Sequence, residues 1–189
     1  MIKQVNRWVW MLAVSASTLF LGGCDRSDDA VEPDEGELIT TVTMRFTEQG
    51  VTNPQSQTVT VRDLDGDGGQ PPVTTGSISL RAGRTYTLNV AQVLDESKSP
   101  AENVLEEIEE EADEHLFVYT PSPASLLTYT YGDRDRNNRP IGITGTVVAG
   151  TAGTGTLNVR LRHQPGTKDG TPTPGSDDVN ITFPVTVAN

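Results

Sequence analysis

The sequence has few of the residues that support catalysis or covalent cross-linking. It contains one cysteine, Cys24, so no disulfide can form within the chain and no thiolate cluster can bind a metal. Aromatic residues make up only 5% of the chain, which leaves no evident platform for stacking sugars. Lys and Arg number 14 against 26 Asp and Glu, for a formal net charge of -12. This balance argues against a nucleic-acid partner, because affinity for phosphate backbones comes from Lys and Arg.

Motifs of the common enzyme classes are missing as well. The chain has no H-E-x-x-H, no G-x-S-x-G and no G-x-x-x-x-G-K-[ST]. The glycine-rich segment 145–157 lacks the lysine that a phosphate-binding loop requires. Acidic residues are so abundant that no single carboxylate pair points to a glycosidase. We therefore expect a protein that is not an enzyme.

The N-terminal segment predicts export and lipidation. Lys3 and Arg7 precede an apolar or small-residue run, residues 8–21, that is too short to span a bilayer comfortably. The run leads into L-G-G-C, which resembles the lipobox of bacterial lipoproteins, in which the cysteine becomes the acylated first residue of the mature chain. We expect residues 1–23 to be a signal peptide and Cys24 to carry a lipid anchor, which attaches the protein to a membrane without spanning it.

An acidic segment, residues 24–37, follows the signal. It holds seven acidic residues between Asp25 and Glu37, and Val31 is its only large apolar side chain. Such a segment buries too little surface to offset its ordering entropy, so we expect a flexible tether. Acid-rich stretches directly after the acylated cysteine resemble the surface-export signals of Bacteroidota lipoproteins. We expect an outer-membrane lipoprotein exposed at the cell surface, with a periplasm-facing protein as the alternative.

Residues 38–189 are expected to form one mainly-β domain. Period-two alternation of apolar residues with Thr and other polar residues marks half-buried strands. Six segments show it clearly (38–46, 58–62, 77–80, 85–94, 155–163 and 179–187), and three show it weakly (116–119, 126–131 and 141–148). The alternation places Leu38, Leu94 and Ile181 on core faces, and Pro184 indicates an edge strand or a bulge. These about nine strands predict an antiparallel β-sandwich of immunoglobulin-like or Greek-key type, with a barrel as the alternative.

One short acidic helix is expected among the strands. Ser99, Pro100 and Glu102 match a capping box, which predicts a helix beginning at Pro100. Four residues fall on one side and are expected to pack on the sandwich: Val104, Leu105, Ile108 and Ala112. The other faces carry Glu102, Glu106, Glu107, Glu109, Glu110, Glu111, Asp113 and Glu114. These like charges repel one another, so a cation, a basic partner or solvent screening should compensate them.

A family resemblance covers nearly all of the chain that follows the signal. It is carried by the lipobox together with "ELITTVTMRF", "DLDGDG", "PAENVLEEIEEEADEH", "YGDRDRNNRPIG" and "LNVRLRH". These motifs resemble those of small Bacteroidota lipoproteins, which often bear the label "type 1 periplasmic binding fold superfamily" and often lie near genes for TonB-dependent outer-membrane receptors. The resemblance implies an accessory role beside such a receptor. The label implies an α/β fold, whereas the strand pattern predicts a sandwich.

The stretch "DLDGDG" is a candidate calcium loop. Asp63, Asp65 and Asp67 occupy positions 1, 3 and 5, and Gly68 occupies position 6, where a sharp turn is needed. Position 12 is Thr74 instead of the glutamate of an EF-hand, but shorter loops of this form also bind calcium. The alternative is a polar hairpin turn, because Asp-Gly pairs commonly form hairpins.

A second loop repeats this spacing with Asp133, Asp135 and Asn137. Asn138 stands where glycine would be expected, and asparagine tolerates the left-handed conformation. The loop also carries Arg134, Arg136 and Arg139. These arginines would repel a cation or pair with the aspartates, so a salt-bridged turn is the alternative to a calcium site.

The two histidines of the chain suggest a different metal site. His115 follows the acidic helix, and His163 lies on the core-facing side of its predicted strand. Imidazoles together with Glu111, Glu114 or Asp113 could bind zinc or iron. Alternatively, His163 ends a strand at the rim of the core and His115 caps the helix exit. Two hypotheses follow: a non-catalytic accessory lipoprotein, or a lipoprotein that binds a divalent metal.

Overall fold

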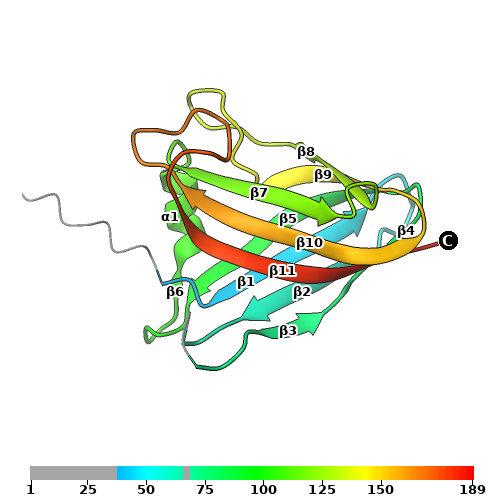
Figure 1. Ribbon diagram of the computed structural model, residues 1–189, viewed down its shortest axis with the longest axis horizontal. Coiled ribbons are helices and arrows are strands. Elements are labelled where there is room, and N and C mark those ends of the chain that lie inside the picture. Colours follow the sequence, from blue (N-terminus) through cyan, green and yellow to red (C-terminus); the bar gives the residue numbers. More distant parts are fainter. Residues whose placement is uncertain (1–37, 66–68) are drawn as a thin grey trace, which may run out of the picture. The chain divides into compact units, whose positions relative to one another are not determined.

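Two β-sheets and one short helix make up the part of the protein that the computed structural model describes, residues 38–65 and 69–189 (Figure 1). The first sheet has the order β3 (Val73–Gly76), β2 (Ser56–Arg62), β1 (Thr41–Glu48), β5 (Thr85–Asp95), β9 (Thr144–Ala149) and β8 (Leu127–Tyr131), and β6 (Glu102–Asn103) pairs with β5. The second has the order β4 (Ile78–Arg81), β11 (Ser176–Ala188), β10 (Gly153–His163) and β7 (His115–Ser122). The predicted signal peptide, Cys24 and the acidic tether lie outside the described residues.

The predicted mainly-β sandwich is confirmed. The inward faces of the two sheets supply one hydrophobic core, in which Phe46, Phe117 and Phe183 are fully buried. The alternation predicted most of this core correctly, as in β10, where Leu157, Val159 and Leu161 are all buried. The sheets are antiparallel except where β4 runs parallel to the end of β11. The α/β fold that the family label implies is not the fold of this chain.

A bulge in β5 overturns one part of the predicted alternation. Thr43 pairs with Gln92 but Met44 pairs with Val90, so Ala91 is an extra residue in β5. A bulge shifts the following side chains to the opposite face. Val93 is therefore fully buried, whereas Leu94, which the unbroken alternation places in the core, is only partly buried.

Three other residues also differ from the predicted pattern. Leu38 precedes β1 and is 45% exposed, and Ile181 is only partly buried against the core. Pro184 lies in β11, which is flanked by β10 and β4 and is therefore not an edge strand. Its missing N–H is tolerated because the pairing with β4 begins only at Val185. The bulge of β11 occurs elsewhere, opposite Arg162.

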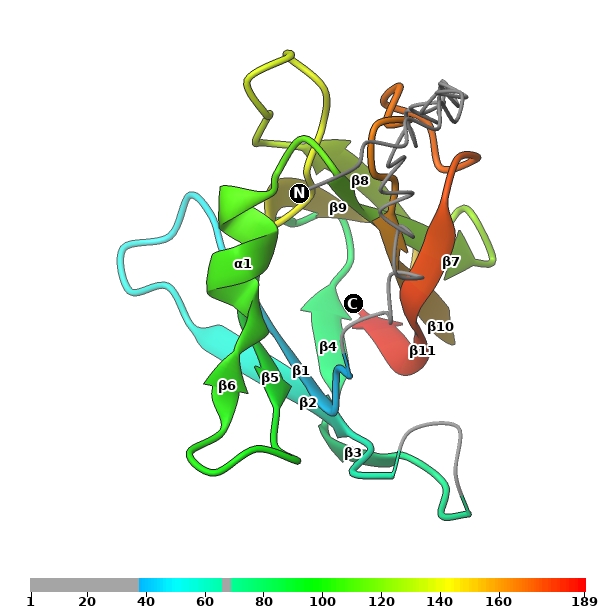
Figure 2. The same ribbon diagram turned by 90° about the vertical axis from the view of Figure 1, so that its left-hand side faces the viewer.

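The helix α1 (Val104–Glu110) begins four residues later than the capping box predicts. Glu102 and Asn103 instead pair with Asp95 and Leu94 as strand β6, so their backbone belongs to the sheet ladder. Asn103 is the N-cap, without a capping hydrogen bond from its side chain. Val104 and Ile108 are buried as expected, and the helix lies beside β5 at one end of the sandwich (Figure 2).

Two strands were not predicted, β3 and the two-residue β6. All four residues of β3 are exposed, so its sequence shows no buried face. Within residues 38–65 and 69–189, no helix has the length and apolar character that a membrane crossing requires.

Candidate metal-binding site

The two histidines lie side by side because of the strand register. In the antiparallel pair of β7 and β10, His115 is directly opposite His163. Directly opposed side chains on one face of a sheet lie within contact distance. The two imidazole rings stack, with centroids 4.8 Å apart and an angle of 5° between their planes. Both residues continue core-facing rows, those of Phe117 and Leu161, so the pair lies at one end of the hydrophobic core and His115 is only 1% exposed.

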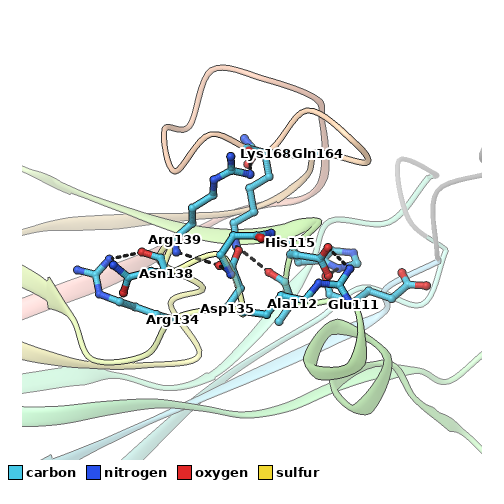
Figure 3. Close-up of polar contacts among 12 residues, drawn as sticks. Glu111, Ala112, His115, Arg134, Asp135, Asn138, Arg139, Gln164 and Lys168 are labelled. Carbon is cyan, nitrogen blue, oxygen red and sulfur yellow. Dashed lines mark hydrogen bonds and ion pairs between the residues drawn. The ribbon is translucent and has the colours of Figure 1, made fainter.

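Glu111 joins the histidines from the end of α1. It is the C-cap residue, and its N–H donates to the carbonyl oxygen of Glu107. Its own carbonyl oxygen lies 3.2 Å from Nδ1 of His115, four residues later (Figure 3). A carboxylate oxygen of Glu111 and one ring nitrogen each of His115 and His163 all lie within 4.8 Å of one another. The structure therefore brings together three of the five residues that the sequence suggested for a transition metal.

Two more carboxylates approach this cluster. Glu114, another predicted residue, has Oε2 3.9 Å from Nε2 of His163. Asp178, which the sequence did not suggest, has Oδ2 3.9 Å from Nε2 of His115. Asp113, the other predicted oxygen ligand, forms an ion pair with Arg136. We call Glu111, His115, His163 and Asp178 the histidine cluster.

The chemistry of this donor set matches a borderline-soft divalent metal. Two imidazole nitrogens and carboxylate oxygens are ligands of zinc and of other late transition metals, whereas calcium prefers six or more oxygens. Zinc bonds of about 2.0–2.1 Å in a tetrahedron place neighbouring donors roughly 3.3 Å apart. The donors, within 4.8 Å of one another, would therefore have to approach by about 1.5 Å at most.

A buried lysine holds the two loops beside the histidine cluster. Lys168 donates from Nζ to the carbonyl oxygen of Ala112 at 2.7 Å, and its Nζ lies 3.0 Å from Oδ2 of Asp135 (Figure 3). Both side chains of this ion pair are almost fully buried. Ala112 adjoins Glu111, and the N–H of Gln164, directly after His163, donates to the carbonyl oxygen of Glu114. We call Lys168, Asp135 and the Ala112 carbonyl the lysine clamp. It ties the backbone beside Glu111 to the loop that follows His163 and to the loop of Asp135.

The pKa values of the clamp follow from burial and pairing. Burial lowers the pKa of the Lys168 ammonium, and the Asp135 carboxylate opposes that decrease. Burial alone would raise the pKa of the Asp135 carboxyl. The N–H groups of Arg139 and Asn137 and the charge of Lys168 outweigh it, so that pKa is lowered.

The second aspartate loop, which contains Asp133 and Asp135, forms the salt-bridged turn that was the alternative prediction. The cation that pairs with Asp135 is Lys168 instead of an arginine of the loop. The two oxygens of Asp133 accept hydrogen bonds from the N–H groups of Gly142 and Thr144, at 2.8 and 2.7 Å. Oδ1 of Asp135 accepts from the N–H groups of Asn137 and Arg139. Asn138 has a φ of 62°, the left-handed conformation expected of it. These contacts favour the turn over a calcium site at Asp133, Asp135 and Asn137.

The first aspartate loop is described only in part, because Asp67 and Gly68 lie outside the described residues. Oδ2 of Asp65 accepts hydrogen bonds from the N–H groups of Gly69 and Gln70, both at 3.1 Å. The bond from Gln70 is the main reason that the pKa of Asp65 is lowered. The N–H of Asp63 donates to the carbonyl oxygen of Thr40 at 2.7 Å. Calcium binding by Asp63, Asp65 and Asp67 stays a prediction.

The fold and the site together define a two-sheet β-sandwich with an imidazole–carboxylate cluster at one end of its core. Searches for relatives found no matching protein family, no matching curated protein and no matching solved structure. The function is therefore argued from the site.

Proposed function

We propose that this chain is a non-catalytic lipoprotein whose sandwich domain binds a divalent transition-metal ion, with zinc as the best match. The observation that carries the proposal is the convergence of Glu111, His115 and His163. These residues come from the end of a helix and from two strands, and the histidines are 48 positions apart in the sequence. The strand register alone makes the two imidazoles neighbours.

The burial of the site supports binding over catalysis at an open surface. His115 is almost completely buried, and His163 keeps only 13% of its side-chain exposure. Glu111 is exposed and provides the side from which an ion could enter. Buried, pre-positioned ligands lose little side-chain entropy when they bind a metal, which favours affinity.

The location is proposed from the sequence. The lipobox at Cys24 supports an acyl anchor, and the acidic segment after it supports display at the surface of the outer membrane. Mass spectrometry of the protein extracted from membranes should find the chain beginning at Cys24 with acyl groups attached. A chain that begins elsewhere, or an unmodified thiol, would contradict the anchor and leave the metal site to be judged separately.

A role as an accessory to a TonB-dependent receptor is the second candidate. Four glutamates of α1 are exposed at the same end of the sandwich as the histidine cluster: Glu106, Glu107, Glu109 and Glu110. Such a surface suits a basic partner by charge complementarity. Co-purification from the native membrane in detergent tests it, because a stoichiometric receptor is expected and the recovery of the lipoprotein alone would contradict it.

Calorimetry tests the metal proposal directly. The purified full-length protein in detergent is titrated with zinc, and we expect one ion per chain. The double variant His115→Gln/His163→Gln should weaken the affinity by more than about 100-fold, because it removes ligands and not only their supporting residues. The control Glu109→Gln/Glu110→Gln removes two exposed charges of α1 and should leave the affinity within about threefold, because exposed charges are screened. Equal affinity of wild type and double histidine variant would refute the site.

A further inference from the structure

We propose that Asp178 is a fourth ligand of the metal site, so that the site is closed by four side chains of this chain. The inference rests on the proposed metal-binding function and deepens it. It concerns a residue that the pattern of the sequence assigns to the opposite face of its strand.

A bulge in β11 turns Asp178 toward the histidines. Leu161 pairs with Val179, but Arg162 pairs with Asp177, so Asp178 is the extra residue of β11. Without the bulge, Asp177 would share the core-facing side with Val179, and Asp178 would point outward. Bulges are common next to functional sites, where they re-aim a side chain.

The neighbours of the bulge confirm which way each acid points. Asp177 forms ion pairs with Arg162 at 2.6 Å and Arg160 at 3.7 Å, both on the outward face of β10. Asp178 lies on the opposite side, with its side chain 5% exposed and its Oδ2 3.9 Å from Nε2 of His115. The side chains of these two adjacent acids therefore lie on opposite faces of the sheet.

The orientation of His115 makes Nε2 the ring nitrogen that lies near Asp178. Its Nδ1 lies 3.2 Å from the carbonyl oxygen of Glu111, an acceptor for an N–H at that position. Metal-binding histidines usually donate their second ring N–H to such a carbonyl, which fixes the tautomer and the ring. With the proton on Nδ1, Nε2 carries the lone pair, and Oδ2 of Asp178 lies 3.9 Å from this nitrogen.

The separation of these two atoms fits an ion between them. Zinc–nitrogen and zinc–oxygen bonds are each about 2.0–2.1 Å, so one ion can reach both atoms if they lie within about 4.1 Å of each other, and the distance of 3.9 Å is inside this limit. A tetrahedral arrangement needs the two atoms only about 0.6 Å closer. Glu114 lies at the same distance from His163, but its side chain is 36% exposed whereas that of Asp178 is 5% exposed, so of these two carboxylates we assign Asp178 to the fourth position and Glu114 to the rim of the site.

Four protein ligands would make this a closed metal site, without a coordination position for water or substrate. Closed tetrahedral sites hold zinc for structure or storage, whereas catalytic sites keep one position open for water or substrate. The ion would join the end of α1, the beginning of β7, the end of β10 and the beginning of β11. The structure thus points to a retained zinc ion that braces this end of the sandwich.

The first test compares the two adjacent acids in the full-length protein. Asp178→Asn should weaken zinc binding by about 10-fold to 100-fold in competition with a chelating indicator. Asp177→Asn is the matched control, with the same chemical change one residue away, and should leave the affinity within about threefold of wild type because its carboxylate faces away from the cluster. Thermal melting without metal shows whether either variant is folded. If wild type binds zinc and Asp178→Asn binds it equally well, the fourth ligand is refuted while the proposed function stands.

A second test does not depend on lost affinity. Asp178→Cys places a thiolate at the same position, and cobalt(II) replaces zinc as the probe. A sulfur-to-cobalt charge-transfer band in the near ultraviolet is expected for Asp178→Cys, and no such band for Asp177→Cys or wild type. Absence of the band from a folded, cobalt-loaded Asp178→Cys protein would show that residue 178 does not touch the metal. If wild type binds neither zinc nor cobalt, the proposed function itself fails.

Discussion

The lysine clamp and the histidine cluster lie at the same end of the sandwich, and both bury charged or titratable groups. The clamp brings its own cation, because Lys168 is paired with Asp135 and the Ala112 carbonyl. The histidine cluster brings imidazoles and carboxylates, which are groups that bind cations from outside. The comparison teaches that burial alone does not separate a structural ion pair from a binding site. The chemical identity of the partners does.

Removal of the clamp cation should have the largest effect on stability. Lys168→Met leaves the Asp135 carboxylate buried without its charge partner, so we expect a loss of about 3–5 kcal/mol in the free energy of unfolding. Urea denaturation measures it.

The matched control for this prediction is Lys98→Met. Lys98 is 57% exposed, and it pairs with Glu102 at the surface and, at 3.7 Å, with Asp95. The buried carboxylate of Asp95 also accepts two hydrogen bonds from Ser97, so the loss of Lys98 should cost at most about 1 kcal/mol. Equal losses for the two variants would mean that the clamp contributes no more than a surface pair.

Metal binding at the histidine cluster should add to the stability of the protein. A ligand at about 100 times its dissociation constant adds about 2.7 kcal/mol to the free energy of unfolding. Zinc should therefore raise the melting temperature of wild type and not that of His115→Gln/His163→Gln. Acidification should weaken this stabilisation, because protons compete with the metal for the imidazole nitrogens. A zinc effect of equal size at about pH 7.5 and about pH 5.5 would contradict imidazole ligation.

The ion pair of Arg62 and Glu96 at the surface extends the comparison, because it belongs neither to the lysine clamp nor to the histidine cluster. Hydrogen bonds from Arg62 and Thr41 lower the pKa of Glu96 from 4.5 to about 2. A lowered folded-state pKa means that the contribution to stability is complete above the ordinary value and is lost as the pH falls from 4.5 to about 2.

The variants Glu96→Gln and Arg62→Gln should be less stable than wild type at neutral pH. Their deficit should shrink through this acid window, as urea midpoints measured at decreasing pH would show. A deficit that is independent of pH would mean that the carboxylate charge contributes nothing to stability.

Calcium should have the smallest effect, and it should separate the two aspartate loops. In Asp133 and Asp135 the carboxylates already accept hydrogen bonds from backbone N–H groups, so a calcium-dependent rise in melting temperature should survive Asp133→Asn. Asp65→Asn should abolish that rise. Melting that is unchanged between saturating calcium and a chelator would remove the predicted site at Asp63, Asp65 and Asp67.

The sequence predicted the features that depend on regular alternation. It placed His163 on the core-facing side of β10, together with Leu157 and Leu161, and it grouped Glu111 and His115 with it as possible ligands. That His115 is directly opposite His163 depends on strand register, which spacing along the chain does not specify.

What the sequence could not predict follows from interruptions of the alternation. The bulge at Ala91 moves Val93 into the core, and the bulge at Asp178 moves an acid toward His115. Each bulge is a single extra residue, and no residue type in the sequence identifies its position. The clamp was missed because Lys168 reaches Asp135 from a loop 33 positions later in the chain. The helix begins later than predicted for a similar reason. The pairing of Glu102 with β5 depends on contacts distant in the sequence, and it overrides the local capping signal.

The most direct test of the central claim is the position of the ion itself. Crystals of the full-length protein grown with zinc should show one strong anomalous-scattering peak at the zinc absorption edge, lying between Nε2 of His115, the ring of His163 and the Glu111 carboxylate. A strong peak only at the Asp63–Asp65 loop, or no peak in zinc-containing crystals, would contradict the metal site proposed at the end of the sandwich.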